Sequence, residues 1–392
     1  MHFISRVDES NGEEFDEEST IKYYYRSGFE YKEILLHLEK RHGYVISKRT
    51  LLRRLESYGL FRRGHQVPDN NYQNVRRRLE EIINGPGSCG GYRTVWHTLQ
   101  MEGLQVPRNV VASLLKELDP EGTEFRKAWR LQRREYHNPG PNYAWHIDGY
   151  DKAKPWGFSI HGGIDGFSRK ILWLKVCRSN KSPDVIAHMY LNSIVNVGGC
   201  PVELITDLGT ENAIVAAIQS YFRENPDAHR YVPSPRNQRI ESWWSILSKT
   251  RFIWWRNFFT DLEFQGILDL SDEISKECLW YTFSGLIQKE LDDVVEHWNT
   301  HRIRKSRHNC VAGRPDSMFY IPESYGAVDM KLPVEERQID HVSNDIRVIN
   351  GEDSEYKEYF DYVMTGLTLE MPDNWVGCLR VFQRLLHTAK DN

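Results

Sequence analysis

The sequence predicts an α/β protein whose sheet-containing region is preceded by small helical modules. Two short apolar runs, residues 143–148 and 202–207, each end in an aspartate and have the length of buried strands. Upstream of residue 120, apolar residues instead recur at helical spacing. With 392 residues, of which 40% are apolar, the chain is long enough for two or three domains.

Composition limits the protein class further. The six cysteines are scattered and form no Cys-x-x-Cys pair, which argues against a disulfide framework and favours a reducing compartment. No run is long and apolar enough for a membrane span, and the first residues lack a signal-peptide core. We therefore expect no membrane partner. No small-molecule cofactor is expected either.

The net charge of −4 conceals an uneven distribution. Residues 1–19 carry seven acids against Arg6 alone, which predicts an acidic disordered tail. Residues 20–66 contain eleven Lys or Arg and four Glu, a balance of +7. From Tyr320 onward, fourteen acids and seven bases give −7. The basic stretch near the amino end is the electrostatic candidate for phosphate contact.

The basic stretch reads as three short helices, Ile21–Ser27, Tyr31–His42 and Lys48–Tyr58. Gly43 suits the C-cap of the second helix and Ser47 the N-cap of the third, in which Leu51, Leu52 and Leu55 are expected to face inward. This is the layout of a helix-turn-helix, and the third helix would leave four bases for DNA: Lys48, Arg49, Arg53 and Arg54. The alternative is a small helical bundle with a solvated basic face.

A second helical unit is expected over Asn74–Leu118, within a module of residues 67–119. Arg93 and Arg108 are its candidate phosphate contacts, whereas Tyr92 and Trp96 are expected in its core. Residues 120–141 read as a basic linker, whose arginines either follow a DNA backbone or form a solvated helix face: Arg126, Arg130, Arg133 and Arg134.

Three acids then form an ordered set: Asp148, Asp207 and Glu241. If the two strands that end in the aspartates are parallel neighbours, both carboxylates emerge at one sheet edge. Glu241 is expected just inside a helix that Pro235 introduces and that runs to about Lys249. Carboxylates brought together from distant segments suit Mg²⁺, which prefers oxygen ligands. Two such ions can neutralise charge during attack on a phosphodiester.

Other acids nearby have plainer roles. Asp165 and Asp151 are the rival carboxylates for the site. Asp165 opens a turn beside Gly166, so a structural role is expected for it. Glu211 is expected in the first turn of the helix Thr210–Glu224, where an acid is favourable.

The sequence motifs around the three acids resemble those of a known protein superfamily. These are Asn-Tyr-Ala-Trp-His-Ile-Asp-Gly-Tyr-Asp (142–151), Ile-Asp-Gly-Phe-Ser-Arg-Lys (164–170), Asp-Leu-Gly-Thr-Glu-Asn (207–212) and Asn-Gln-Arg-Ile-Glu-Ser-Trp-Trp (237–244). With 33 residues between Asp207 and Glu241, residues 140–320 resemble the DDE integrase/transposase superfamily, which has a catalytic core of the retroviral-integrase type.

The resemblance implies an RNase H-like core, a mixed five-stranded sheet with helices on both faces, over about residues 142–290. It implies that Asp148, Asp207 and Glu241 are the catalytic residues and metal ligands. Two Mg²⁺ ions would be the cofactor, with Mn²⁺ as a substitute. Double-stranded DNA would be the partner, both as element ends and as target, and the protein would be a nuclear homo-oligomer.

Several residues around Glu241 would grip the DNA end in this superfamily: Asn237, Arg239 and Lys249. The nearby tryptophans are expected mainly in the core, with base stacking as the lesser alternative: Trp243, Trp244, Trp254 and Trp255. Residues 67–119 resemble the module that precedes the core in several transposases. The sequence lacks the His-His-Cys-Cys zinc module and the basic carboxyl-terminal barrel of retroviral integrases.

After the core, residues 291–325 form a post-core helical tail in this interpretation, and 326–392 are an acidic region without an assigned role. The predicted function is Mg²⁺-dependent cleavage of a phosphodiester and transfer of a 3′ end into target DNA. Two alternatives stay open. The chain could be a domesticated DNA-binding protein that kept the fold and lost catalysis, or a structural protein that uses the core as a dimer platform.

Overall fold

The computed structural model of the chain describes residues 16–60, 69–85, 87, 90–104, 106–120, 138–305, 311–346 and 355–391. The chain divides into two compact units, each assembled from segments that lie far apart in the sequence. The first contains residues 1–143, 167–170 and 297–330, and the second contains 144–166, 171–296 and 331–392. The predicted linker arginines and most of the acidic tail lie outside the described residues.

The first unit begins with a three-helix module made of α1 (Glu17–Arg26), α2 (Tyr31–His42) and α3 (Lys48–Ser57). Helix α1 starts earlier than the sequence predicted, because the Asp16 carboxylate accepts hydrogen bonds from the backbone N–H groups of Glu18 and Ser19. Gly43 ends α2 with a left-handed φ of 62°, as the sequence indicated. The module encloses its own apolar core, which includes Tyr24, Phe29, Ile34, Leu38, Leu51 and Leu55.

Helix α3 differs from the prediction at one leucine. Leu51 and Leu55 are buried, but Leu52 is 41% exposed. Residues 52 and 51 are one position apart on a helix, which is a rotation of about 100°, so both cannot face the same core. Leu52 therefore lies on the outer face of α3 with Arg49 and Arg53.

A second small core joins α4 (Asp69–Ile83), α5 (Tyr92–Met101) and α6 (Arg108–Leu118), as predicted for this region. Trp96 is partly buried against this core. Tyr92 is 37% exposed, so its expected place in the core was wrong. Tyr92 is the first residue of α5 and lies on the solvent side of its first turn.

Residues 297–330 complete the first unit, and we call them the hub segment. They contain the last residues of α12 (Glu273–Thr300) and the short helix α13 (Pro315–Tyr320). Met318 and Ala327 of the hub segment pack with Phe167, from the turn that joins two strands of the sheet. Lys170 of the same turn forms a buried ion pair with Asp316.

The second unit is built on a five-stranded sheet in the order β3-β2-β1-β4-β5. The strands are β1 (Ala144–Tyr150), β2 (Ser159–Asp165), β3 (Ile171–Cys177), β4 (Glu203–Thr206) and β5 (His229–Tyr231). The first three pair antiparallel, whereas β4 is parallel to both β1 and β5. The sheet is therefore mixed, as an RNase H-like core requires.

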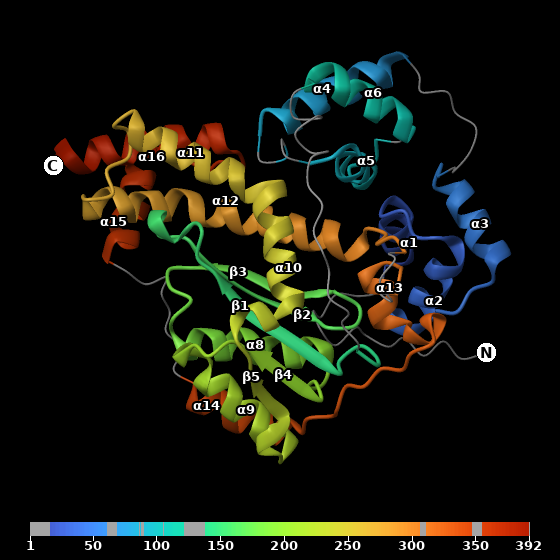
Figure 1. Cartoon of the computed structure of the whole chain (residues 1–392). Coiled ribbons are helices and arrows are strands. Elements are labelled where there is room, and N and C mark those ends of the chain that lie inside the picture. The colour runs from blue at the N-terminus through green and yellow to red at the C-terminus, as the bar shows by residue number, and fades with distance from the viewer. Residues whose placement is uncertain are drawn as a thin grey trace. The chain divides into compact units, whose positions relative to one another are not determined.

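Helices cover both faces of this sheet (Figure 1). One face carries α8 (Pro183–Val197) and α9 (Ala213–Arg223), which share an apolar core with β1, β3 and β4. The other carries α10 (Gln238–Leu247), which contacts β1 and β2. A wide π-helical turn, Ser248–Phe252, joins α10 to α11 (Ile253–Phe264), so the helix predicted to end near Lys249 continues.

Aromatic rings fill the space between the sheet and α10–α12. Phe158 stacks on Phe259 and on Trp280, with ring centroids 5.3 and 5.6 Å apart. Trp243, Trp244 and Trp255 are at most 5% exposed. Core packing, the first of the two predicted roles, therefore accounts for these three tryptophans.

The carboxyl-terminal residues, for which the sequence suggested no role, add three helices to the second unit: α14 (Glu336–Asp345), α15 (Glu355–Gly366) and α16 (Trp375–Asp391). Val342 and Ile346 extend the core beneath α8. The Tyr281 hydroxyl of α12 donates to Asp361 of α15 at 2.7 Å. Over the described ranges, the chain has no helix of the length and hydropathy that crossing a bilayer requires.

Candidate active site at the sheet edge

The three predicted acids line one pocket of about 470 Å³ in the second unit, which we call the acidic pocket. The end of β1, the segment before α8, the turn after β4, and α10 with the π-helical turn that follows it form its walls. Besides Asp148, Asp207 and Glu241, its lining includes Asp151, Asn180, Lys181, Glu211, Ser234, Trp244, Ser245, Ser248 and Lys249.

Strand register brings the two aspartates together. The parallel pairing of β1 and β4 sets His146 opposite Ile205, so Asp148 and Asp207 each come two residues further along. Residues two apart on a strand point to the same side of the sheet. The sequence placed Asp148 at a strand end, but β1 continues to Tyr150 and pairs with β2 on its other side.

The Asp207–Asn212 turn is held by its own side chains. The Asp207 carboxylate accepts hydrogen bonds from the Gly209 backbone N–H at 3.1 Å and from the Asn212 amide at 2.9 Å. Glu211 folds back over Gly209, where an added Cβ would lie 2.5 Å from the Glu211 carboxyl carbon. A larger residue at position 209 would therefore displace the Glu211 carboxylate from its place in the turn.

Glu211 forms an ion pair with Lys181 at the pocket wall. The sequence placed Glu211 in the first turn of a helix, and it lies instead in a 3₁₀ turn, Thr210–Asn212, that precedes α9. The Lys181 side chain is about half exposed, and the negative charges of Glu211, Asp151 and Asp207 act on it. Lys181 is therefore placed at the pocket wall, where it can meet an incoming phosphate.

Glu241 reaches the pocket from the first turn of α10, and its carboxylate accepts a hydrogen bond from the Ser234 hydroxyl. The start of α10 is fixed by Asn237, whose amide N–H donates to the Ile147 carbonyl at 3.0 Å. Its amide oxygen lies 2.7 Å from Nδ1 of His146, which must carry the proton because the oxygen can only accept.

These contacts correct one prediction. Asn237 was expected to grip the DNA end, but it is fully buried and its amide is used by β1. It therefore positions Glu241 beside Asp148. His146, which the sequence analysis did not single out, is its partner, and burial lowers the pKa of His146 to about 4.

Asp148 is electrostatically the most unusual acid of the three. Burial raises its pKa to about 7, with the negative charges of Glu241 and Asp207 contributing to the same shift. The Trp244 indole N–H donates to its carboxylate at 3.0 Å, which opposes the shift. Trp244 is thus both a packing residue and a hydrogen-bond donor to the site, a role that its aromatic character alone did not indicate.

A divalent cation would relieve this repulsion, and the donor set suits Mg²⁺, which takes carboxylate oxygens and keeps several waters. Within the described parts of the chain, however, no three His, Cys, Asp or Glu side chains lie close enough to hold one ion together. Each of the three carboxylates instead accepts a hydrogen bond from a neighbour.

A model of a protein family matches the part of the chain that contains the acidic pocket. The residues matched are 135–319, and the model is described as an integrase core domain. This range contains all five strands and the three acids. Over these residues the chain is similar to an integrase core domain. The match is consistent with the DDE integrase/transposase superfamily, and the observed sheet is consistent with an RNase H-like core. None of the curated proteins compared with the chain matches it.

The two other candidate DNA contacts of the integrase core differ in exposure. Lys249 is exposed and lines the acidic pocket from the π-helical turn. Arg239 is partly buried, and its positive charge lowers the pKa of His146 in addition to the effect of burial. Both side chains are therefore close to the elements that position the acids.

The candidate contacts outside the integrase core lie on the first unit. Lys48, Arg49 and Arg53 are exposed on α3. Arg54, also predicted there, is exposed as well and forms an ion pair with Glu17 at 2.8 Å. The Arg54 side chain is 44% exposed in spite of this pair, so its contact with DNA stays a prediction.

On the second helical module, both predicted arginines are exposed. Arg93 extends over the ring of Tyr92, its neighbour in the sequence. The Arg108 guanidinium lies 3.9 Å from the centre of the Trp96 ring. An arginine stacked in this way keeps its donors available at the ring's edge.

Proposed function

We propose that the protein is a DNA integrase or transposase that cleaves a phosphodiester and joins a 3′ end to target DNA in a Mg²⁺-dependent step. The observation that carries the proposal is the acidic pocket of the integrase core. There, β-strand register and the Asn237 clamp bring Asp148, Asp207 and Glu241 to one wall.

In such a reaction a hydroxyl oxygen, from water or from a DNA 3′ end, attacks phosphorus in line. The opposite P–O bond breaks, and its oxygen leaves with the released strand. Two Mg²⁺ ions, or Mn²⁺ as a substitute, would neutralise charge on the attacking and leaving oxygens. Asp148, Asp207 and Glu241, which line the same pocket, would hold the metal.

The chain's own side chains support these roles. Trp244 and the Gly209 N–H orient the carboxylates of Asp148 and Asp207 by hydrogen bonds. Lys181 and Lys249 both line the pocket and would hold phosphates of the DNA. The exposed bases of α3 would bind duplex DNA outside the core.

A second candidate, a DNA-binding protein without catalysis, is favoured by one specific observation. Each acid accepts a hydrogen bond from a neighbour, and among the described residues no three His, Cys, Asp or Glu side chains are grouped to hold one ion. The nuclear location and self-association expected from the sequence are parts of both proposals. The third alternative, an interaction platform, requires no DNA binding.

A plasmid assay distinguishes the three candidate functions. It measures the conversion of supercoiled plasmid to nicked or joined products in the presence of Mg²⁺, Mn²⁺ or EDTA. We expect the parent chain to act only with a divalent metal. Asp207→Asn should abolish products and leave DNA binding nearly intact, because it removes a metal ligand and no phosphate contact. Binding without products would favour the second candidate, and the absence of both would favour the third. A variant that acts as fast as the parent would exclude Asp207 as a ligand.

A further inference from the structure

Helix α2 of the three-helix module is docked along its length on the hub segment. Polar residues at helical spacing, on one side of α2, each contact it: Glu30, Glu33, His37 and Lys40. Residues three and four apart share one helix face. Their partners are Arg302, Arg314, Ser317 and Glu323, and the first of these is 272 residues from Glu30.

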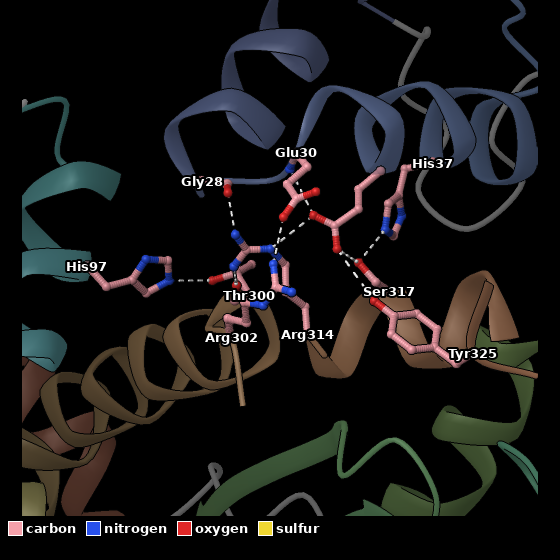
Figure 2. A network of polar contacts seen from close by, with 10 residues as sticks. Gly28, Glu30, His37, His97, Thr300, Arg302, Arg314, Ser317 and Tyr325 are labelled. Carbon is pink, nitrogen blue, oxygen red and sulfur yellow. Dashed lines mark hydrogen bonds and ion pairs between the residues drawn. The ribbon is translucent and has the colours of Figure 1, made fainter. Parts of the chain in front are cut away.

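Arg314 is the centre of this network (Figure 2). Its side chain is only 8% exposed, and it donates to the carbonyl oxygens of Thr300, at 2.6 Å, and Gly28. It also pairs with Glu33 at 3.4 Å. A buried guanidinium needs partners of this kind, because an unpaired buried charge is very costly. The hub segment is therefore fixed against the turn between α1 and α2.

The second helical module is attached to the same segment. His97 of α5 and the Thr300 hydroxyl are 2.9 Å apart, and the rings of His97 and His297 are in contact, with centroids 4.7 Å apart. Burial lowers the pKa of His97 to about 3, so this contact is between neutral groups at ordinary pH. Both helical modules thus rest on residues that follow the integrase core's sheet in the sequence.

Three bases of the hub segment remain at the surface: Arg302, Arg304 and Lys305. We call them the basic stem. Ile303, between them, exchanges backbone hydrogen bonds with Gly313 at 2.8 and 3.1 Å, which fixes the backbone here. Arg302 pairs with Glu30 at 2.6 Å, and both side chains are about 60% exposed. Arg304 and Lys305 are exposed and pair with none of the acids that the structure describes.

We propose that the basic stem contacts the phosphates of duplex DNA beside α2, as part of one binding surface with α3. This inference rests on the proposed DNA-binding function of the helical modules. In helix-turn-helix proteins, the helix before the reading helix crosses the DNA backbone. Arg302 is held at Glu30, the residue that caps this helix. Its surface ion pair is weak enough to be exchanged for a phosphate.

Charge selects DNA over an acidic protein as the partner. The module already exposes Lys48, Arg49 and Arg53 on α3, and the basic stem adds three cations to the same unit. A DNA backbone presents regularly spaced negative charges that these cations can neutralise. The DNA-binding surface is therefore composite, formed by segments on either side of the core's sheet in the sequence.

The test uses the full chain and a fluorescent random-sequence duplex. EDTA is present to remove divalent metal, so that binding is measured without catalysis. Binding is titrated at several salt concentrations for the parent, for R302A/R304A/K305A and for a control, R337A/K357A/K390A. The control removes three exposed cations from the second unit and changes the net charge equally. Thermal unfolding checks that both variants remain folded.

Each phosphate contact contributes about 0.9 to the slope of log K against log salt, so three contacts predict a decrease of up to about 2.7. We expect this decrease for the stem variant and a slope like that of the parent for the control. If the parent slope is steep and the stem variant retains it, the stem is only a solvated surface and DNA is held elsewhere. If the parent shows no salt-dependent binding, the proposed DNA-binding function fails as well.

Discussion

Asp148→Asn should make the metal-free protein more stable above neutral pH. The carboxyl group has an ordinary pKa of 3.8, and burial with the charges of Glu241 and Asp207 raises it to about 7 in the folded protein. Between these two values the folded protein retains a proton that the unfolded chain releases. The parent therefore loses stability as the pH rises through this window, and asparagine, which does not ionise, avoids the loss.

The difference between 3.8 and about 7 corresponds to about 4 kcal/mol at 1.36 kcal/mol for each pKa unit. This value is a ceiling, because Asp148 is partly exposed and the folded pocket can relax around a charge. For a unit of this size, about 1 kcal/mol shifts Tm by about 2–4 °C. We therefore expect a gain of several degrees at pH 8 and a much smaller gain at pH 5.

Thermal unfolding in EDTA between pH 5 and pH 8 measures this difference. Glu241→Gln removes a charge that acts on Asp148 and should give a smaller gain in the same direction. Asp340→Asn, which changes an exposed acid of α14, should give none and is the matched control. If the parent and Asp148→Asn lose stability in parallel over this range, the pocket does not destabilise the Asp148 charge and the reasoning is refuted.

Three further substitutions test the surroundings of the acids. Trp244→Phe removes the N–H that lowers the pKa of Asp148, so the pH profile of plasmid nicking should move to higher pH. Asn237→Ala leaves the His146 N–H and a strand carbonyl without their partner, which should cost about 2–5 kcal/mol in urea unfolding and displace α10. Lys181→Ala should raise the KM for DNA several-fold with a smaller change in kcat, because it removes a phosphate contact; an equal loss in both would contradict that role.

The sequence was sufficient for the fold of the core and for the three acids, for identifiable physical reasons. Apolar runs of strand length that end in acids fix the alignment of Asp148 with Asp207 once the strands are parallel neighbours. The helical start near Pro235 likewise placed Glu241 within one turn of the sheet edge. These features are local in the sequence, and local patterns predict them.

Contacts between distant segments were not predictable in the same way. The sequence could not show that the Asn237 amide forms hydrogen bonds with His146 and Ile147. An asparagine that is buried and one that contacts DNA can be flanked by the same residues. The contacts of the polar residues on α2 could not be predicted either, because their partners, among them Arg314, lie more than 270 residues later. A stripe of polar residues opposite an apolar face can contact either solvent or another segment of the chain. The sequence does not distinguish the two until the partner segment is known.

The central claim is that Asp148, Asp207 and Glu241 hold divalent metal. Crystals of the parent and of Asp207→Asn, soaked in Mn²⁺, test it most directly through anomalous scattering. We expect Mn²⁺ peaks in the acidic pocket of the parent, about 2.1 Å from carboxylate oxygens and including Asp148 among the ligands. At least one peak should be lost in the variant. Peaks that lie only elsewhere on the protein, or a variant that retains every pocket peak, would contradict the account.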